Sequence, residues 1–311
     1  MNKGFWRNKK VLVTGASGFV GKHLVLKLKD IEGVDISVTK NSKNDLRNFK
    51  TCLKVCKNQD IVIHLAAKVG GIGFNREFPA DLFEDNILMG VNMMKAARLA
   101  GVKKFVAIGT ICSYPKFTQI PFKEESLWQG YPEETNAPYG LAKLMQLVQA
   151  QTYRQQYGFN AIFLLPVNLY GPGENFDLAS SHVIPALIRK FLEAKENNKK
   201  EVVVWGTGEA TREFLFIDDV VNGILLATEK YNKSEPVNLG AGFEISVKDL
   251  AKTIKRLIGF KGKIVWDKTK PDGQPRRKLD TTRARREFGF ESKMSFETGL
   301  NKTIDWYLAN K

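Results

Sequence analysis

The stretch Val11-Leu-Val-Thr-Gly-Ala-Ser-Gly-Phe-Val-Gly21 decides the fold predicted for this chain of 311 residues. An apolar strand, Val11 to Thr14, runs directly into a Gly-x-x-Gly-x-x-Gly turn, and a helical pattern follows through Leu28. Glycines at such a strand-to-helix junction let the backbone approach a pyrophosphate, which the amino terminus of the helix then stabilises. The stretch therefore predicts a dinucleotide-binding βαβ unit at the start of the chain.

Short apolar strands continue to alternate with helical patterns from Lys9 to about Leu165. Near-continuous apolar strands bounded by amphipathic helices are typical of a parallel sheet that is covered on both faces. The expected strands are residues 11–13, 36–38, 61–65, 105–108 and 161–165. This pattern predicts an α/β fold, a Rossmann-type doubly wound parallel sheet.

The alternation ends after Pro166-Val-Asn-Leu-Tyr-Gly-Pro-Gly173, where loops and scattered elements follow. We expect residues 1–170, completed by about 214–240, to form the dinucleotide-binding domain. Residues 171–213 and 241–311 would form a smaller, discontinuous C-terminal substrate domain.

The chain carries 48 Lys and Arg against 33 Asp and Glu, a formal net charge of +15. Clustered cations neutralise nucleic-acid phosphates. Here the charge is scattered in short runs such as Lys199-Lys200 and Arg285-Arg286, and no RNA-binding aromatic motif accompanies it. A basic cleft for a diphosphate ligand and a solvated lysine surface explain the charge as well, so no nucleic-acid partner is predicted.

The lengths of the apolar runs indicate the compartment of the protein, and the spacing of the cysteines indicates whether it binds a metal. No apolar run approaches the roughly 18 residues that span a bilayer, and the first residues show no signal-peptide pattern. We therefore expect a cytoplasmic protein with no membrane partner. Cys52 and Cys56 would share one helix face, and no second Cys/His pair completes a zinc site, so buried core is predicted rather than a metal site.

The choice of nicotinamide cofactor depends on the tip of the second strand, Val38-Thr-Lys-Asn-Ser-Lys43. An acid there would bind the ribose 2′-hydroxyl and repel a 2′-phosphate. Asp35 precedes the apolar residues of this strand and should lie at its wrong end, whereas Lys40 and Lys43 would attract a phosphate. The tip favours NADP (NADPH); the alternative interpretation is that both lysines are simply solvated.

A candidate catalytic pair lies in Pro138-Tyr-Gly-Leu-Ala-Lys143, which opens a helix expected to continue through Tyr157. Tyr139 and Lys143 are i and i+4, so both side chains emerge on one helix face. A free phenol has a pKa of about 10, and a neighbouring ammonium would lower it, which makes Tyr139 a candidate general acid/base. Thr110, at the end of its strand, can donate a hydrogen bond to the same substrate oxygen.

The glycine loop, Thr110, and Tyr139 with Lys143 resemble the extended branch of the short-chain dehydrogenase/reductases. Further segments resemble the GDP-L-fucose synthase family over essentially the whole chain. They are "HLAAKVGGIG" (64–73), "PVNLYGPGENFD" (166–177), "SSHVIPALIRKF" (180–191), "WGTGEATREFLFIDD" (205–219) and "KPDGQPRRKLD" (270–280). The resemblance implies a 3,5-epimerase/4-reductase acting on a GDP-linked 4-keto-6-deoxy sugar with NADPH. It also implies a homodimer packed through helices that flank the sheet.

The family pattern at residues 109–115 is Gly-Ser-Ser-Cys-Ile-Tyr-Pro, and this chain has Gly-Thr-Ile-Cys-Ser-Tyr-Pro. Thr110 takes the place of the catalytic serine, Cys112 matches the epimerisation base, and His182 matches its partner acid. A ketone at C4 acidifies the hydrogens on C3 and C5, so a thiolate and an imidazole can exchange protons on opposite faces. Because strand residues alternate in direction, Thr110 and Cys112 are expected to face one site. Ile111 stands where the family pattern has its second serine, so this chain lacks that hydroxyl.

The resemblance also implies binding roles, in which guanidinium and ammonium groups suit a diphosphate. The cofactor-binding residues implied are Gly15, Ser17, Gly18, Phe19, Val20, Gly21, Lys40, Ala66, Lys143 and His182. The substrate-binding residues implied are Asn168, Val183, Lys190, Trp205, Arg212 and Arg277.

Other functions of the same fold fit the sequence less well. A 4,6-dehydratase would need Thr-Asp-Glu where this chain has Thr-Ile-Cys, and a 4-epimerase favours an acid where Thr39 stands. A non-catalytic dinucleotide sensor would not need Thr110, Tyr139 and Lys143 together. A dedicated GDP-4-ketosugar C4-reductase, acting on a hexose or heptose without epimerisation, remains the open alternative.

Overall fold

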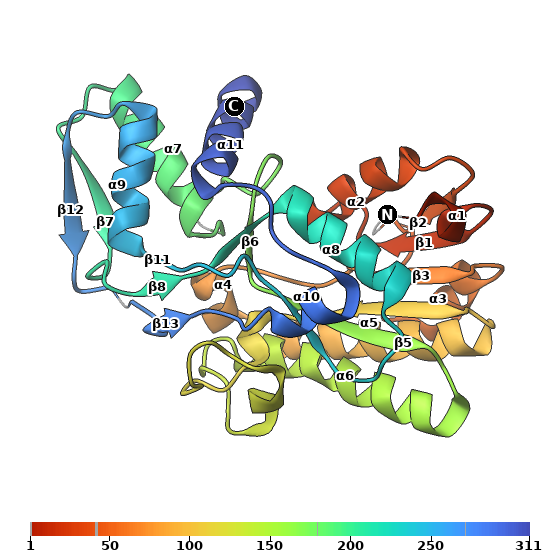
Figure 1. Cartoon of the computed structure of the whole chain (residues 1–311). Helices are drawn as coiled ribbons and strands as arrows, with labels where there is room; N and C mark the ends of the chain where they lie inside the picture. The colour runs from red at the N-terminus through yellow and green to blue at the C-terminus, as the bar shows by residue number, and fades with distance from the viewer. Residues whose placement is uncertain (1, 41–42, 179, 271) are drawn as a thin grey trace.

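The computed structural model of the chain describes residues 2–40, 43–178, 180–270 and 272–311. Its main sheet consists of β1 (Lys10–Thr14), β2 (Asp35–Val38), β3 (Ile61–His64), β4 (Lys104–Ile108), β5 (Ala161–Pro166) and β10 (Val237–Leu239). The strand order is β10-β5-β4-β3-β1-β2 and every neighbouring pair is parallel (Figure 1). The predicted doubly wound fold is confirmed.

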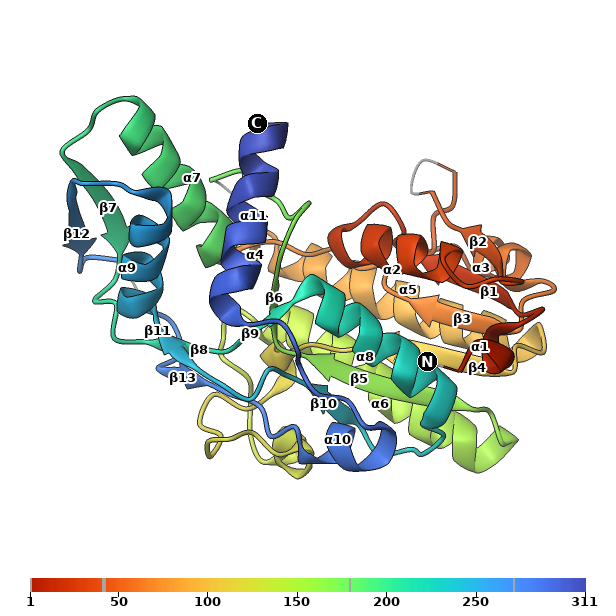
Figure 2. The same cartoon turned by 45° about the horizontal axis from the view of Figure 1, so that its top comes forward.

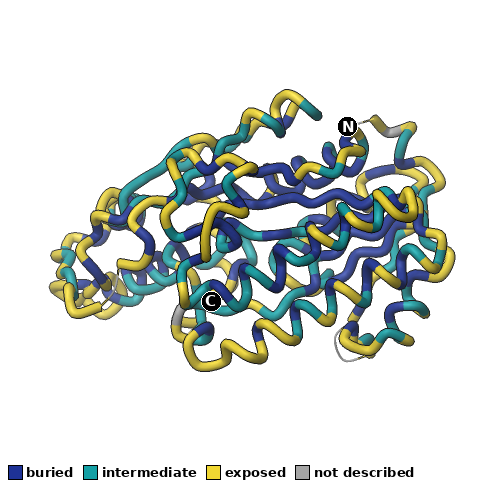
Figure 3. The backbone as a smooth tube through the Cα atoms, turned by 90° about the horizontal axis from the view of Figure 1, so that it is seen from below, coloured by how far each residue is buried: buried dark blue, intermediate teal, exposed yellow. Residues whose placement is uncertain are grey.

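Helices cover both faces of this sheet (Figure 2). They are α2 (Phe19–Lys29), α3 (Phe49–Cys56), α5 (Pro79–Leu99), α6 (Ala137–Tyr157) and α8 (Ile217–Lys230). The helices α3, α5 and α6 pack side by side on one face, and α2 packs with α8 on the other. The central strands are therefore buried along nearly their whole length, as the backbone coloured by burial shows (Figure 3).

The remaining elements form a second, smaller lobe around three short sheets. The parallel pair β6 (Asn168–Tyr170) and β9 (Phe214–Phe216) leads into it, and β7 (Glu201–Trp205) pairs with β12 (Lys263–Asp267). β8 (Thr211–Arg212) lies between β11 (Ile245–Ser246) and β13 (Arg276–Arg277). Its main helices are α7 (Val183–Glu196), α9 (Val247–Ile258) and α11 (Phe296–Asn310). The short helices of the chain are α1 (Lys3–Trp6), α4 (Ile72–Glu77), η1 (Ile111–Ser113), η2 (Glu124–Trp128) and α10 (Thr282–Phe288).

The position of α10 differs from the expected domain division, which placed residues 241–311 in the second domain. α10 packs against α8 and β10 of the main sheet. The ring of Phe288 meets Tyr231 at 5.9 Å, and Arg283 Nη1 donates to Pro236 O at 2.7 Å. The chain thus returns to the first lobe before α11, because the apolar face of α10 is buried there.

Two further sequence expectations concern cysteines and membranes. Cys52 and Cys56 are fully buried on α3, as core side chains. Within the described residues, no group of three or more potential ligands could hold a metal ion. Across that same part of the chain, no helix combines the length and hydropathy that a membrane span requires.

A buried carboxylate joins the two lobes. Glu213 is 0% exposed, and its Oε1 accepts from the backbone N–H groups of Ala241 (2.6 Å) and Gly242 (2.7 Å). Its Oε2 accepts from Leu279 N at 2.6 Å. We call this group of contacts the Glu213 clamp; it ties β8 and β9 to the segment after β10 and to the segment before α10.

Replacing Glu213 with glutamine should lower the free energy of unfolding by about 1–3 kcal/mol, because an NH₂ group cannot accept from a backbone N–H and leaves a buried donor unpaired. Urea unfolding followed by circular dichroism measures the change. Glu209→Gln is the matched control, since Glu209 is exposed and lies 3.6 Å from Lys248; it should change stability by less than about 0.5 kcal/mol. Equal stability of the two variants would contradict a structural role for the clamp.

Candidate active site

The predicted phosphate-binding loop lies between β1 and α2, where the strand order reverses. Gly15 has a φ of +69°, and a Cβ there would lie 2.7 Å from Ala66 N; a Cβ on Gly21 would lie 2.2 Å from Gly15 O. Neither position has room for a side chain, so the loop keeps backbone at its surface. Gly18, the N-cap of α2, has no side-chain cap and the first turn holds no acid. These features fit a pyrophosphate at the helix amino terminus.

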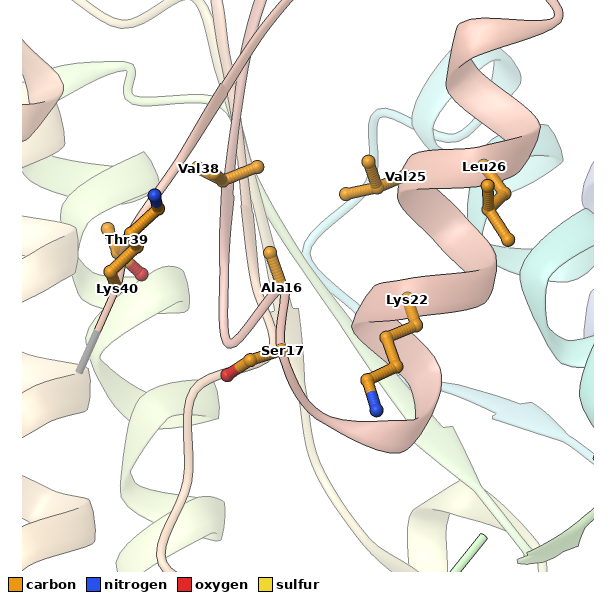
Figure 4. A pocket seen from close by; sticks show the side chains of 8 residues that line it. All are labelled: Ala16, Ser17, Lys22, Val25, Leu26, Val38, Thr39 and Lys40. Atoms are coloured by element: carbon orange, nitrogen blue, oxygen red, sulfur yellow. The ribbon is translucent and has the colours of Figure 1, made fainter. Parts of the chain in front are cut away.

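A pocket of about 420 Å³ adjoins this loop (Figure 4). It is lined by Ala16, Ser17, Lys22, Val25, Leu26, Val38, Thr39 and Lys40. Asp35 begins β2 and so lies at the far end of that strand, as expected. Lys40 is at the pocket, whereas Lys43 is not among the lining residues, and residues 41 and 42 between them lie outside the described residues.

Lys22 also lines this pocket, although it was not among the residues predicted from the sequence. Its ammonium reaches from α2 toward the loop that carries Ser17, across the pocket from Lys40 (Figure 4). The pocket therefore holds two exposed cations on opposite sides of the space beside the glycine loop. A lysine directly after Gly21 in the first turn of a phosphate-binding helix was the available signal.

Thr110 and Cys112 lie at a tight turn rather than on an extended strand. β4 ends at Ile108, and Thr110 is the N-cap of the 3-10 helix η1; its Oγ1 accepts from Cys112 N at 3.2 Å. The expected strand alternation is therefore wrong, because the capping hydroxyl turns the chain. Ile111 is buried in the core at 3% exposure, while Thr110 and Cys112 stay partly exposed.

Tyr139 and Lys143 lie in the first turns of α6, which packs directly on η1. A Cβ on Gly140 would come within 2.4 Å of Cys112 O, and Ser113 Oγ donates to Gly140 O at 2.8 Å. Position 140 therefore requires glycine. This contact fixes the backbone beside Tyr139 relative to the backbone of Cys112.

The environment of the pair sets its protonation. Desolvation raises the pKa of Tyr139 above its ordinary value, and neighbouring Cys112 raises it further. Desolvation lowers the pKa of Lys143 to about 8. The prediction that Lys143 lowers the pKa of Tyr139 is wrong for this structure, because desolvation dominates. A protonated phenol near a largely charged lysine is nevertheless the correct state for donating a proton to a substrate oxygen.

His64 and Thr14 fix the start of the loop that contains Ala66. The fully buried His64 Nδ1 lies 2.8 Å from Thr14 Oγ1, and that oxygen accepts from Ala66 N at 3.1 Å. Desolvation lowers the pKa of His64 to about 3, with a smaller contribution from Lys143. The ring is therefore neutral, and it holds the ends of β1 and β3 together where the cofactor loop begins.

His182 and Val183 begin α7, as its N-cap and first helical residue. A Cβ on Gly71 would lie 3.4 Å from Ser180 O, so the segment before α7 lies against the loop that follows β3. His182 is exposed at its surface, but desolvation by the surrounding protein lowers its pKa. Among the described contacts none joins His182 to Cys112, so their pairing stays a prediction.

Two of the predicted basic residues converge near Cys112. Arg277 Nη1 lies 3.7 Å from Cys112 Sγ. Arg212 donates to Thr211 O (2.7 Å) and to Asp272 O (3.1 Å). Burial, and next the nearby Arg277, lower the pKa of Arg212. The second lobe thus places two guanidinium groups at the turn that carries the sulfur.

The other predicted substrate residues lie farther out on the second lobe. Trp205 ends β7 and is 61% exposed; the ammonium groups of Lys190 and Lys270 lie 5.8 and 5.4 Å from its ring centroid. An exposed indole with two cations near its ring suits a flat ring attached to phosphates. Asn168 Nδ2 donates to Glu213 O at 2.9 Å, so part of this side chain is already occupied within the protein.

Sequence reasoning also missed the residues that position these groups. Glu213 and Gln274 are both buried, and each makes a long-range hydrogen bond: Glu213 accepts from Leu279 N, and Gln274 donates to Lys116 O. No local pattern marks them, since their partners are 28 or more residues away in the case of Glu213. They can be found only once the two lobes are placed together.

Comparisons with known proteins place the chain in a family. Residues 11–240 match the NAD dependent epimerase/dehydratase family. The chain is 40% identical to GDP-L-fucose synthase 1 of Arabidopsis thaliana over 306 residues, which covers 98% of this chain and 94% of the relative.

Two solved structures from Campylobacter jejuni extend the likeness to three dimensions. A GDP-6-OMe-4-keto-L-xylo-heptose reductase superposes with a TM-score of 0.92 at 27% identity, covering 100% of this chain and 99% of that one. A GDP-mannoheptose C4 reductase with NADP bound superposes with a TM-score of 0.90 at 28% identity, covering 99% of each chain. The chain therefore belongs to the NAD dependent epimerase/dehydratase family.

Proposed function

We propose that this enzyme uses NADPH to reduce the C4 ketone of a GDP-linked 4-keto-6-deoxy sugar after epimerising that sugar at C3 and C5. One observation carries the proposal: Tyr139 and Cys112 lie on two segments in direct contact, so a proton donor and a sulfur base serve one site. Similarity to a GDP-L-fucose synthase over nearly the whole chain supports this activity.

The reduction step uses the residues around the end of β4. The Oγ1 of Thr110 accepts from Cys112 N, which leaves its own hydrogen free to bind the C4 oxygen. Tyr139 then donates its proton to that oxygen, and Lys143 stabilises the negative charge that develops on the phenol. The bound NADPH supplies a hydride to C4.

The epimerisation step uses Cys112 and His182. While the C4 ketone persists, the Cys112 thiolate removes a proton from C3 or C5, so a C–H bond breaks and an S–H bond forms. The electron pair moves into an enolate whose oxygen faces Thr110 and Tyr139. His182 returns a proton to the opposite face from its imidazolium form, which the negative charge of the diphosphate substrate favours.

A dedicated C4-reductase is the second candidate. It is favoured by a specific observation, since both solved structures described above are named as reductases and superpose with TM-scores of 0.92 and 0.90. In that case Cys112 and His182 would bind the sugar without exchanging its protons. The two candidates differ in one measurable property, proton exchange at C3 and C5.

The nucleotide end of the substrate fits the outer part of the second lobe. The exposed Trp205 ring offers a stacking surface for the guanine base, and Lys190 beside it offers positive charge for the diphosphate. Arg212 interacts with Cys112, so its charge is available where the phosphates would approach the sugar. We assign Asn168 and Val183 to the sugar end on the family resemblance.

The cofactor is NADP, and the prediction made from the strand tip is confirmed, since a similar reductase holds NADP. We assign the 2′-phosphate to the pocket beside the glycine loop, between Lys22 and Lys40. Thr39 at the strand tip is 2% exposed and carries no charge that would repel a phosphate. Lys43 contributes less, because it does not line the pocket.

Replacing Lys22 and Lys40 with alanine should weaken NADPH binding by ~10-fold or more while leaving NADH nearly unchanged, since only NADPH carries the phosphate that loses two charged partners. Fluorescence titration of both cofactors measures the difference. Lys29→Ala is the matched control, because Lys29 ends α2 about 10 Å along the helix axis from Lys22. Equal loss for the two cofactors would contradict the assignment.

The test of the proposed function separates the two reactions. With NADP in place of NADPH, the ketone persists, and NMR should detect deuterium from heavy water entering C3 and C5 of a GDP-4-keto-6-deoxy sugar. Cys112→Ser should abolish this exchange but still reduce a ketosugar that already has the product configuration. Tyr139→Phe should do the reverse, with measurable exchange and a kcat for reduction lowered ~100-fold or more, because general acid catalysis of this kind contributes that much.

Both variants are compared for NADPH affinity, which neither should change. If the wild-type protein reduces a GDP-ketosugar but exchanges no deuterium into any that it reduces, the dedicated reductase is the correct function. If it reduces none of a panel of GDP-linked 4-ketosugars, the proposed function is wrong in both forms.

We also propose a homodimer formed through the outer faces of α5 and α6. Leu88 and Val91 on α5 and Val148 on α6 are exposed at 39%, 39% and 37%, and Gln149 Nε2 donates to Val91 O, so these side chains lie near one another. Two such faces related by a twofold axis would form a four-helix bundle with an apolar centre.

Changing Val91 to glutamate should convert the dimer to a monomer, because a twofold interface would place two buried carboxylates close together. Analytical ultracentrifugation measures the mass. Val265→Glu is the matched control, since Val265 on β12 is equally exposed, at 38%, but lies on the second lobe. A wild-type monomer at micromolar concentration would contradict the proposal.

A further inference from the structure

The family resemblance assigns Arg277 to the diphosphate, but its contacts in this structure point elsewhere. Arg277 is 9% exposed. Its Nη1 lies 3.7 Å from Cys112 Sγ, and its Nε donates to Gln274 Oε1 at 2.8 Å. The guanidinium is thus directed at the sulfur by a second buried side chain.

Gln274 fixes the direction of this guanidinium. Its Nε2 donates to Lys116 O at 2.7 Å, which requires its Oε1 to face Arg277. Lys116 follows Cys112 by four residues, so the contacts form a closed ring from Cys112 through Arg277 and Gln274 to Lys116 and back along the chain. The backbone of Arg277 is held as well, since its carbonyl accepts from Glu213 N at 3.1 Å. The hydrogen bond from Gln274 to Lys116 places the segment that leads into β13 beside the loop that follows η1.

The charges that face the sulfur come from three elements. Arg277 on β13 is in contact with it, and Arg212 on β8 lies near enough to interact with both Cys112 and Arg277. Tyr139 on α6 also interacts with Cys112, and because the pKa of Tyr139 is raised, its phenol is neutral at pH 7. The described charged groups that interact with Cys112 are therefore both positive, and one of them, the Arg277 guanidinium, is in contact with its sulfur.

We propose that Arg277 is a positioning residue for epimerisation: its guanidinium holds the Cys112 sulfur as a thiolate and fixes its direction, instead of binding the diphosphate. The inference deepens the proposed function and rests on it. When the thiolate takes the proton from carbon, the S–H bond forms and the guanidinium keeps its charge, which then stabilises the enolate. Release of that proton to water restores the thiolate.

The test measures the reactivity of the thiol without any substrate. The rate at which iodoacetamide alkylates Cys112 is followed against pH, with mass spectrometry to identify the modified residue. Cys52 and Cys56 are fully buried, so they should not react in the folded protein, and Cys112→Ser gives the background. Arg277→Gln should slow alkylation at pH 7 by ~10-fold and move the pH of half-maximal rate upward by about one unit, because it removes the neighbouring charge.

Two variants separate the charge from the packing. Arg277→Lys should keep the alkylation rate at pH 7 within ~3-fold of wild type, because it restores a cation at the same place. Arg276→Gln is the matched control, since Arg276 is exposed and pairs with Glu244 rather than Cys112, and it should leave the profile unchanged. If Arg277→Gln does not fold, Gln274→Leu takes its place. Slowed alkylation is then expected because the guanidinium loses the hydrogen bond that orients it toward the sulfur.

Different outcomes bear on the role of Arg277 and on epimerisation itself. Identical pH profiles for wild type and a folded Arg277→Gln, with GDP affinity lost in calorimetry, would overturn the inference and return Arg277 to the diphosphate. Slowed alkylation with GDP affinity within ~3-fold of wild type would support it. Absence of deuterium exchange in the wild-type protein would refute epimerisation itself, whatever the alkylation experiment gives.

Discussion

The buried carboxylate of Glu213 is the interaction on which the arrangement of the two lobes depends. It accepts three backbone N–H groups from two separate segments, and its own backbone bonds to Arg277 and to Asn168. A buried charge is tolerated only where donors surround it. Because Arg212 immediately precedes Glu213 and the backbone of Arg277 bonds to Glu213 N, the same clamp positions the basic groups that lie near Cys112.

The elements that form the candidate site differ in how deeply they are buried. The glycine loop and η1 follow directly on buried strands of the main sheet, whereas Trp205 is exposed on the second lobe with Lys190 and Lys270 beside its ring. Precise placement is thus concentrated where we assign the chemistry, and the exposed contacts lie where we assign the nucleotide. Desolvation acts on the candidate catalytic pair as well. It raises the pKa of Tyr139, which keeps the phenol protonated, and it lowers the pKa of Lys143 to about 8.

Much of the fold could be predicted because local patterns determine it. Alternation of apolar strands and helices indicated the sheet, and the glycine spacing located the cofactor loop. The sequence could not reveal that Thr110 caps a 3-10 turn. The same residues could continue the strand, and only the hydrogen bond from Cys112 N to the Thr110 hydroxyl distinguishes the turn from it. The pKa of Tyr139 was misjudged because spacing on a helix says nothing of desolvation. α10 was placed in the wrong lobe because its partners, α8 and β10, come from another part of the chain.

The contact between Gly140 and the carbonyl of Cys112 leaves no hinge between η1 and α6. Thermal motion must therefore carry Tyr139 and the backbone of Cys112 together as one rigid body. A ketosugar bound against that body meets both groups at a constant separation, and only the ring of the sugar has to turn between the proposed steps.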